Sequence, residues 1–190
     1  MRSGWKVLLL VATLAIVGWP TPARADGFIN PWIGVNFAND TSDGRNAFGV
    51  SAGSIGRGMM GGELDFGYSP SFFGPSDSFG DNNVLDLMVN LTVGVPFGGR
   101  RGLRLRPYAT GGVGLIRSVV NGPANLFDIK NNDIGYNLGF GVMGFVNDHV
   151  GLRGDFRYMR TVNANDTTNE FLFHTGNFHY WRGSFGVVFQ

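Results

Sequence analysis

The sequence contains no cysteine and only two lysines, Lys6 and Lys130, and charged residues occupy just 15% of its 190 positions. Without cysteine the chain can form neither disulfides nor thiolate metal sites. An ordinary soluble domain carries about 25% charged residues, whereas this chain is 43% hydrophobic and 14% aromatic and contains 31 glycines. These values indicate that much of its surface faces something other than water.

Long hydrophobic runs are absent after the N-terminal region, so the sequence offers no segment with the roughly 20 apolar residues of a membrane-spanning helix. The N-terminal region itself has the pattern of a secretory signal. Arg2 and Lys6 precede an apolar stretch over residues 7–19, and small residues flank the arginine of Ala23-Arg24-Ala25. We expect a signal peptide that is cleaved after residue 25.

Cleavage would leave one domain, residues 26–190, and would remove three of the 15 basic residues but none of the 14 acidic ones. The net charge of the mature chain would then be −2. No basic bias remains to suggest a nucleic-acid partner.

Residues 150–159, VGLRGDFRYM, alternate between apolar and charged positions. Because successive side chains of a strand point to opposite faces, a strand collects Arg153, Asp155 and Arg157 on one face. A helix would scatter the three charges around its axis. The opposite face of the strand carries Val150, Leu152, Gly154, Phe156 and Tyr158.

The same alternation predicts seven further strands. The most regular one covers residues 84–95, where six aliphatic side chains oppose polar ones and Met88 is the exception. The other six segments are 28–37, 47–56, 60–69, 103–116, 134–146 and the closing stretch from Trp181 to Phe189.

Connections between these segments alternate strictly in length. Four are long and polar, namely 38–46, 70–83, 117–133 and 161–176, and three are short, namely 57–59, 96–102 and 147–149. An even number of antiparallel strands with long loops at one end and short turns at the other is typical of bacterial outer-membrane barrels. We therefore predict an all-β chain that folds as an eight-stranded antiparallel up-and-down transmembrane β-barrel.

Alternation alone does not distinguish this barrel from a soluble one, in which the apolar face fills the interior. Side-chain size does, because eight strands enclose little space. The charged face also carries small residues, and the apolar face has aromatic residues near the strand ends, as lipid interfaces favour. We therefore expect the charges inside and lipid outside. The small residues are Gly61, Gly67, Gly94, Gly112, Gly114, Gly139, Gly141 and Gly186, and the aromatic ones are Phe37, Tyr68, Tyr136, Tyr158, Trp181 and Phe189.

Three stretches resemble a known family. They are RPYATGGVGLIRS at 106–118, GYNLGFGVMGFVNDHVGLRGDFRYMRT at 135–161 and the terminal YWRGSFGVVFQ. They are similar to small outer-membrane β-barrel proteins of the OmpA and OmpX type. The resemblance implies insertion by the barrel-assembly machinery, which in this family recognises a terminal strand ending in an aromatic residue. Here Phe189 is penultimate and Gln190 is last.

Nine charged residues are predicted to point into the barrel and to form a charge network. Buried charges are tolerated when they are paired and hydrogen-bonded, so we expect a structural plug, with a narrow, porin-like ion path as the alternative. The nine are Glu63, Asp65, Asp86, Arg104, Arg106, Arg153, Asp155, Arg157 and Arg182.

Candidate enzymatic residues are few. His179 and Ser184 fall on opposite faces of one predicted strand, and His149 lies in a predicted turn. The G-x-G-x-x-G match at 139–144 lies inside a strand, where a dinucleotide fingerprint does not function. Asp40 and Asp43 lack the spacing of a calcium loop. We predict no catalytic residue, cofactor or metal; a lipid-modifying enzyme remains the less favoured alternative.

The predicted role is structural, or surface recognition and adhesion through the four long external loops, because binding usually resides in loops on a rigid scaffold. The stretch PSFFGPSDSF at 70–79 would expose aromatic residues to a partner. The expected partners are outer-membrane lipid, the assembly machinery during insertion and a surface ligand. We expect a monomer in the cell outer membrane.

Overall fold

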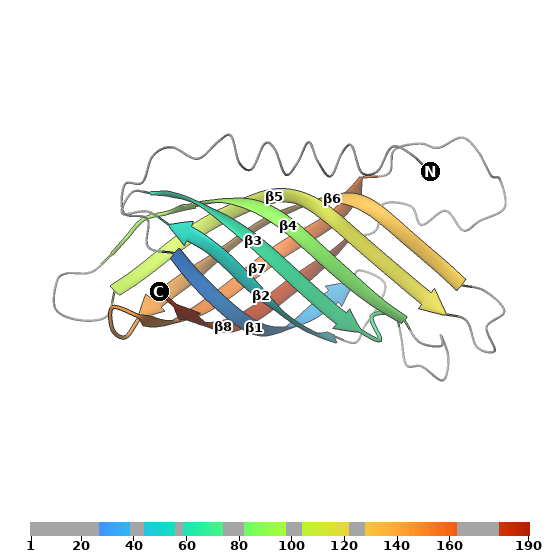
Figure 1. The fold of residues 1–190 in the computed structure, drawn as a ribbon, viewed down its shortest axis with the longest axis horizontal. Coiled ribbons are helices and arrows are strands. Elements are labelled where there is room, and N and C mark those ends of the chain that lie inside the picture. The colour runs from blue at the N-terminus through green and yellow to red at the C-terminus, as the bar shows by residue number, and fades with distance from the viewer. Residues whose placement is uncertain are drawn as a thin grey trace.

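The computed structural model describes residues 27–38, 44–55, 59–73, 82–97, 104–121, 128–162 and 179–190. Eight antiparallel strands pair in sequence order, and β1 also pairs with β8, so the sheet closes into a barrel (Figure 1). The strands are β1 Gly27–Ala38, β2 Arg45–Ile55, β3 Met60–Pro70, β4 Asn82–Gly94, β5 Arg104–Asn121, β6 Asp128–Phe145, β7 Val150–Val162 and β8 His179–Phe189. The predicted all-β, eight-stranded up-and-down barrel is confirmed. A search of these ranges for a helix long and apolar enough to cross a membrane finds none.

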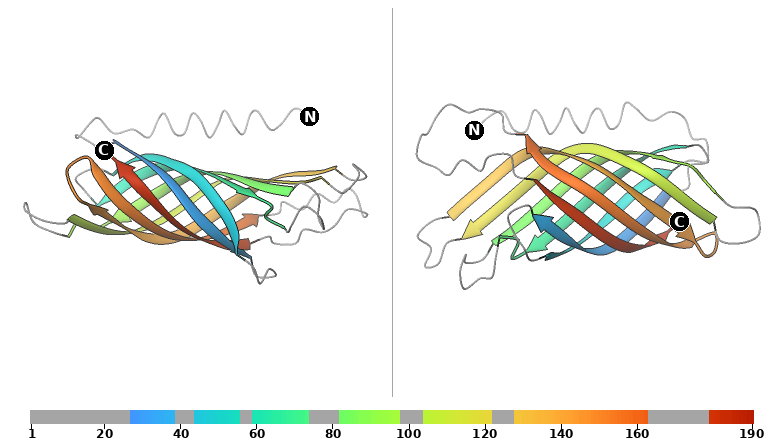
Figure 2. Two further views of the ribbon diagram at one scale, coloured as in Figure 1. Left: turned by 90° about the horizontal axis from the view of Figure 1, so that it is seen from below. Right: turned by 180° about the vertical axis from the view of Figure 1, so that it is seen from behind.

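One prediction of strand length was wrong. Residues 117–121 and 128–133, expected in a loop, continue β5 and β6, whose pairing runs out to Asn121 opposite Asp128. The two long strands project beyond their neighbours in two further views of the barrel (Figure 2). The alternation fades there because strand segments outside the lipid have no reason to carry an apolar face. We call the end at which β5 finishes the long-loop end, and the end that carries the turn 146–149 the short-turn end.

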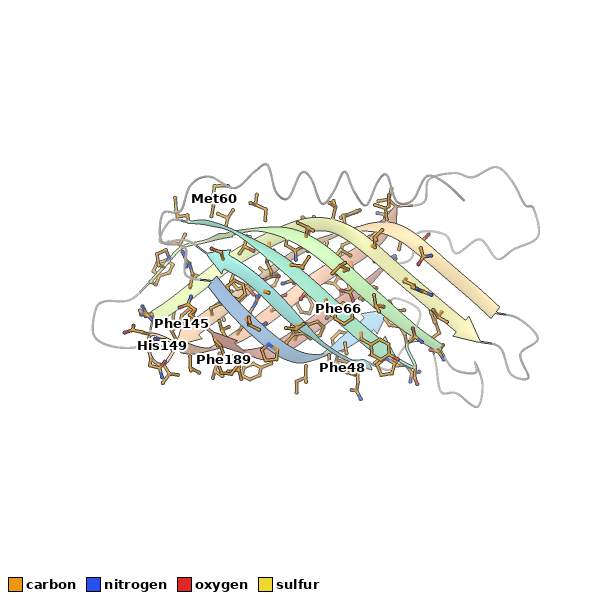
Figure 3. The ribbon with its side chains drawn as sticks, in the orientation of Figure 1. Phe48, Met60, Phe66, Phe145, His149 and Phe189 are labelled. Atoms are coloured by element: carbon orange, nitrogen blue, oxygen red, sulfur yellow. The ribbon has the colours of Figure 1, made fainter. Side chains whose placement is uncertain are left out.

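The apolar face of each strand points outward. Along β4, Val89 is 43% exposed whereas Asp86 is 1% exposed, and the strand alternates in this way from end to end. Figure 3 shows Met60 and Phe189 at the short-turn end and Phe48 at the other. All three are outward-facing and exposed. This is the sidedness predicted for a membrane barrel.

Apolar side chains also fill part of the interior, which the alternation did not predict. One buried cluster lies at the short-turn end and comprises Phe28, Tyr108, Met143, Phe145 and Val188. A second lies at the long-loop end and comprises Phe72, Val84, Met88, Ile116, Met159 and Tyr180. Met88, the exception in the β4 pattern, is therefore an interior side chain.

Two neighbouring glycines test how tightly the interior is packed. A β-carbon on inward-facing Gly141 would lie 2.3 Å from the Tyr108 hydroxyl and 2.4 Å from the Gly154 carbonyl, whereas one on outward-facing Gly154 would meet nothing within 4 Å. We expect Gly141→Ala to lower the free energy of unfolding by about 1–3 kcal/mol through overpacking. Gly154→Ala should stay within about 0.5 kcal/mol of the parent. Urea unfolding in lipid vesicles measures both; equal effects would mean that the lumen around Gly141 is not tightly packed.

Candidate functional site: a charge network across the lumen

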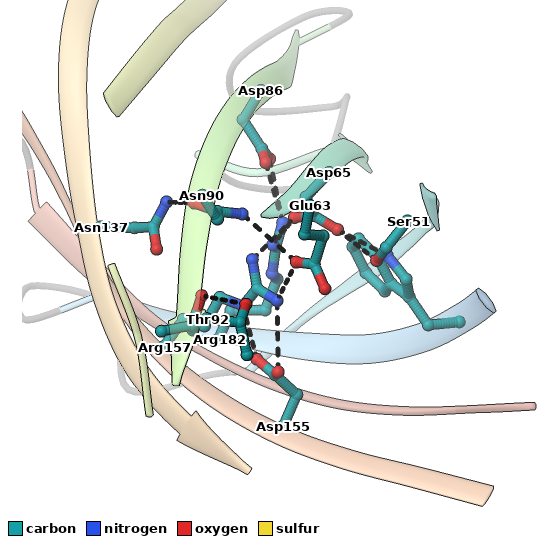
Figure 4. Close-up of polar contacts among 12 residues, drawn as sticks. Ser51, Glu63, Asp65, Asp86, Asn90, Thr92, Asn137, Asp155, Arg157 and Arg182 are labelled. Carbon is teal, nitrogen blue, oxygen red and sulfur yellow. Dashed lines mark hydrogen bonds and ion pairs between the residues drawn. The ribbon is translucent and has the colours of Figure 1, made fainter. Parts of the chain in front are cut away.

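The centre of the lumen holds a network of buried charged side chains (Figure 4). Four strands supply it: β3, β4, β7 and β8. In a closed barrel of eight strands, β3 faces β7 and β4 faces β8 across the interior. Ion pairs between these strands therefore brace opposite walls. The members are Glu63, Asp65, Asp86, Arg153, Asp155, Arg157 and Arg182.

Glu63 forms the first brace by accepting from two arginines on the opposite wall. Arg153 Nη1 donates to its Oε2 at 2.5 Å, and Arg157 Nη2 donates to its Oε1 at 2.6 Å. Both arginines also donate to Asp155, Arg153 through Nη2 at 2.9 Å and Arg157 through Nε at 2.5 Å. Tyr108 completes this half, because its hydroxyl accepts from Arg153 Nε at 2.6 Å and donates to Asp155. Each guanidinium is thus held by more than one carboxylate, which fits its planar, multidentate geometry.

Arg182 forms the second brace, from β8 to β3 and β4. Its Nη1 donates to Asp86 Oδ1 at 2.9 Å, and its Nη2 donates to Asp65. The guanidinium lies over the Trp32 ring, 4.4 Å from the centroid. Asp65 also accepts from Ser51 Oγ at 2.7 Å and from Trp32 Nε1 at 3.1 Å. Asp65 additionally lies 3.4 Å from Arg157 Nη1, so the two braces form one connected network.

Uncharged side chains complete the hydrogen bonding of the carboxylates, which outnumber the arginines. Four carboxylates meet three arginines, a formal charge of −1 when all are ionised. Hydroxyl, indole and amide donors supply the remaining hydrogen bonds that buried carboxylates require. Asn90 Nδ2 donates to Glu63 Oε1 at 3.2 Å, and Asn90 Oδ1 accepts from Asn137 Nδ2 at 2.6 Å, which extends the network to β6. Most of these groups are therefore held by mutual hydrogen bonds; Arg157 Nη1, Arg182 Nε and Asn137 Oδ1 are the buried network atoms for which the described residues supply no hydrogen bond.

The structure places two of the nine predicted network residues elsewhere. Arg104 has a side chain that is 45% exposed and pairs with Asp148 in the turn 146–149 at 3.1 Å, so its assignment to the interior network was wrong. Arg106, partly buried, shares the inward face but also lies near the short-turn end, below the network. Alternation assigns a side chain to a face; it does not give its depth along the barrel axis.

The aromatic side chain of Phe72 closes the long-loop end. Phe72 is only 2% exposed and packs edge-on against Tyr180, with ring centroids 5.1 Å apart. Ser71 has a φ of 50°, the left-handed region in which non-glycine residues are rare. Its amide donates to the Asn82 carbonyl at 2.8 Å, so the chain turns back over the barrel mouth. The prediction that this phenylalanine would be exposed to a partner was wrong; residues 74–79 of the same stretch lie outside the described residues.

The histidines of the described ranges are not close to a nucleophile in the lumen. His149 is exposed in the turn 146–149, and His179 lies on the outward face beside Tyr158, with ring centroids 5.8 Å apart. Ser184 is on the inward face of the same strand as His179. Within these ranges no group of three or more His, Asp or Glu is arranged to hold a metal ion. Asp40 and Asp43 lie outside the described residues.

Four uncharged side chains that contact the network carried a weak signal in the sequence, among them Tyr180, whose hydroxyl lies 3.5 Å from Asp86 Oδ2. Trp32 and Tyr108 fall on the polar face of their strands, which identifies them as inward-facing side chains with a polar atom to satisfy. Tyr180 precedes the stretch predicted as the last strand, and Ser51 lies in a glycine-rich one. The sequence pattern gives the face on which these side chains lie, but it does not give their depth along the barrel axis, and the depth decides which side chains they contact.

The fold and the filled lumen define a small integral outer-membrane type of β-barrel. The sequence matches the outer membrane protein beta-barrel domain family over residues 9–180, and the chain belongs to this family. No functionally curated protein matches the chain.

Solved structures share the fold at low sequence identity. Neisserial surface protein A (NspA) is 17% identical, with a TM-score of 0.62 over 86% of this chain and 96% of that one. Outer membrane protein H (OprH) of P. aeruginosa is 17% identical, with a TM-score of 0.52 over 87% and 99%. Ail, the attachment invasion locus protein of Yersinia pestis, is 10% identical, with a TM-score of 0.51 over 86% and 97%. Identities this low establish similarity of architecture alone.

Proposed function

We propose that this protein is a monomeric, non-conducting scaffold in the cell outer membrane that presents its four long connections for surface recognition or adhesion. Export would use the signal at residues 1–25, and insertion would use the barrel-assembly machinery. The observation that carries the proposal is the filled lumen. Charged groups brace the centre and an apolar cluster lies on each side of them.

A closed lumen moves the functional surface to the outside of the barrel. Porins that leave a water channel use about 16 to 18 strands, whereas eight strands leave room only for side chains. Binding residues are concentrated on loops carried by a rigid scaffold. Two of the structural neighbours have names that refer to the surface or to attachment, NspA and Ail, and this is consistent with such a role.

Conductance separates a scaffold from the narrow-channel alternative. In planar bilayers we expect the purified protein to give no discrete current steps, because crossing the lumen would require ions to pass both apolar clusters and the ion-paired centre. Phe72→Ala should also remain silent, since the central network and the apolar cluster at the short-turn end stay in place. Steady single-channel steps in the parent that Arg157→Gln alters would instead establish an ion path.

Recognition through the connections is tested by shortening them. Residues 74–81 and 163–178 are replaced by brief Gly-Ser segments, and outer-membrane vesicles carrying parent or variant are applied to an immobilised array of glycans and extracellular-matrix proteins. We expect the parent to bind at least one component and the variant to lose that binding while keeping the heat-dependent gel mobility of a folded barrel. A parent that binds no component, or a shortened variant that binds as the parent does, would refute the proposal.

A further inference from the structure

The outer wall of β5 to β8 carries positive charge at the long-loop end. Among the described side chains of the strands, two that carry a full charge face outward. They are Arg117 on β5 and Arg160 on β7. His179, the first residue of β8, lies directly across from Arg160. Neither arginine forms an ion pair with any residue in the described part of the chain.

The outward face of the other half of the same rim is neutral, because Arg45, the first residue of β2, lies on the inward face. At the corresponding ends of β1 to β4 the outward-facing side chains are Phe37, Asn46, Pro70 and Asn83. A general need for interfacial arginines, which reach the water with their heads while their stems cover the wall, would not confine them to one half. The asymmetry therefore points to a ligand on the β5 to β8 side.

A continuous line of aromatic rings runs down the wall from the cations. Tyr158 contacts both His179 and Trp181, with centroids 5.8 Å and 4.9 Å apart, and Trp181 stacks on Phe156 at 5.2 Å with an interplanar angle of 23°. Phe156 in turn contacts Phe140 at 5.8 Å. Flat, rigid rings of this kind offer a large apolar contact area to a hydrocarbon chain.

Two outward-facing glycines form a shallow depression in the outer surface of the barrel beside these rings. A β-carbon on Gly154 would have open space around it, and one on Gly183 would meet nothing nearer than the Phe156 ring at 3.7 Å. The wall is thus recessed next to the stacked pair of Phe156 and Trp181. A chain lying there can contact ring faces and the strand backbone together.

We propose that this wall binds one phosphorylated glycolipid of the outer leaflet, with its phosphates held by Arg117 and Arg160 and its acyl chains lying along the aromatic rings. The arginine fork pairs phosphate through two hydrogen bonds, and these are stronger at the edge of a low-dielectric wall than in water. The site is on the barrel wall, so it is separate from recognition by the loops and does not depend on it.

Native mass spectrometry of the purified chain in phosphatidylcholine nanodiscs, titrated with bis-phosphorylated lipid A, tests the site. The parent should retain one lipid A, and Arg117→Gln/Arg160→Gln should bind it at least about tenfold more weakly, as expected when a charge-assisted hydrogen bond is lost. Arg104→Gln is the matched control, because it removes an exposed arginine from the opposite end, and it should bind as the parent does. Heat-dependent gel mobility verifies that each variant is folded.

Two further titrations identify the source of the phosphate. Dephosphorylated lipid A should bind the parent about as weakly as intact lipid A binds the double variant, and inorganic phosphate should not compete. Equal binding of the two lipids, an equal loss in Arg104→Gln, or displacement by inorganic phosphate alone would each overturn the proposal, the last by showing a site for a free anion.

Discussion

Replacing Glu63 by alanine should lower the free energy of unfolding by about 3–5 kcal/mol, the range seen when one partner of a buried ion pair is removed. Glu63 is the carboxylate that accepts from both Arg153 and Arg157 across the lumen. Without it Asp155 would be the main counter-charge of Arg153, and the link between β3 and β7 would be reduced to the 3.4 Å ion pair of Asp65 with Arg157. The loss of hydrogen-bonded counter-charge in a dry interior outweighs any relief of desolvation.

Reversible urea unfolding in phospholipid vesicles, followed by tryptophan fluorescence, measures the change. Trp32 reports on the lumen because it contacts Asp65 and Arg182. Glu63→Gln preserves the side-chain volume and removes the charge. It should show most of the decrease in unfolding free energy seen in Glu63→Ala, which would assign the decrease to the lost charge and not to a cavity. Arg104→Ala removes the exposed pair with Asp148 and should cost less than about 1 kcal/mol. Losses of equal size in Glu63→Ala and Arg104→Ala would mean that the braces do not stabilise the barrel.

The sequence specified the strands and their faces because both follow from a period of two. Along β4 the alternation predicted that Leu87 and Val89 face outward and that Asp86 and Asn90 face inward, as the structure shows. The lengths of β5 and β6 were underestimated because their outer parts lie beyond the apolar zone that produces the pattern. Strand pairing continues there without it, out to Asn121 opposite Asp128.

Depth within the lumen was harder to obtain from the sequence. An up-and-down order of eight strands implies that β3 faces β7, yet which side chains meet depends on register and tilt, which the pattern does not encode. Arg104 shares a face with Tyr108, but it lies at the barrel end and pairs with Asp148. The two buried apolar clusters were not predicted, because the alternation pattern of a membrane barrel assigns polar residues to the interior. Met88, the one exception in its strand, was the visible sign of them.

A charge placed in the middle of the outer wall should be nearly as costly as breaking a brace. Val89 faces outward near the centre of β4, and Asn83 shares its face at the long-loop end of the same strand. Arginine at the middle of a lipid-facing barrel wall costs about 2–4 kcal/mol, and near the interface about 0–1 kcal/mol. We therefore expect Val89→Arg to lower the free energy of unfolding by about 2–4 kcal/mol and Asn83→Arg to change it little.

The pair of variants keeps strand, face and introduced side chain constant, so that depth in the lipid is the variable. Unfolding in vesicles gives both values, and the same variants in detergent micelles should differ less, because a micelle deforms around a charge more easily than a bilayer. Val89 and Asn83 variants of equal stability in vesicles would mean that water reaches the outer wall at both depths. The inward-facing charges would then have no lipid to avoid, and burial between opposite walls would have to account for the braces alone.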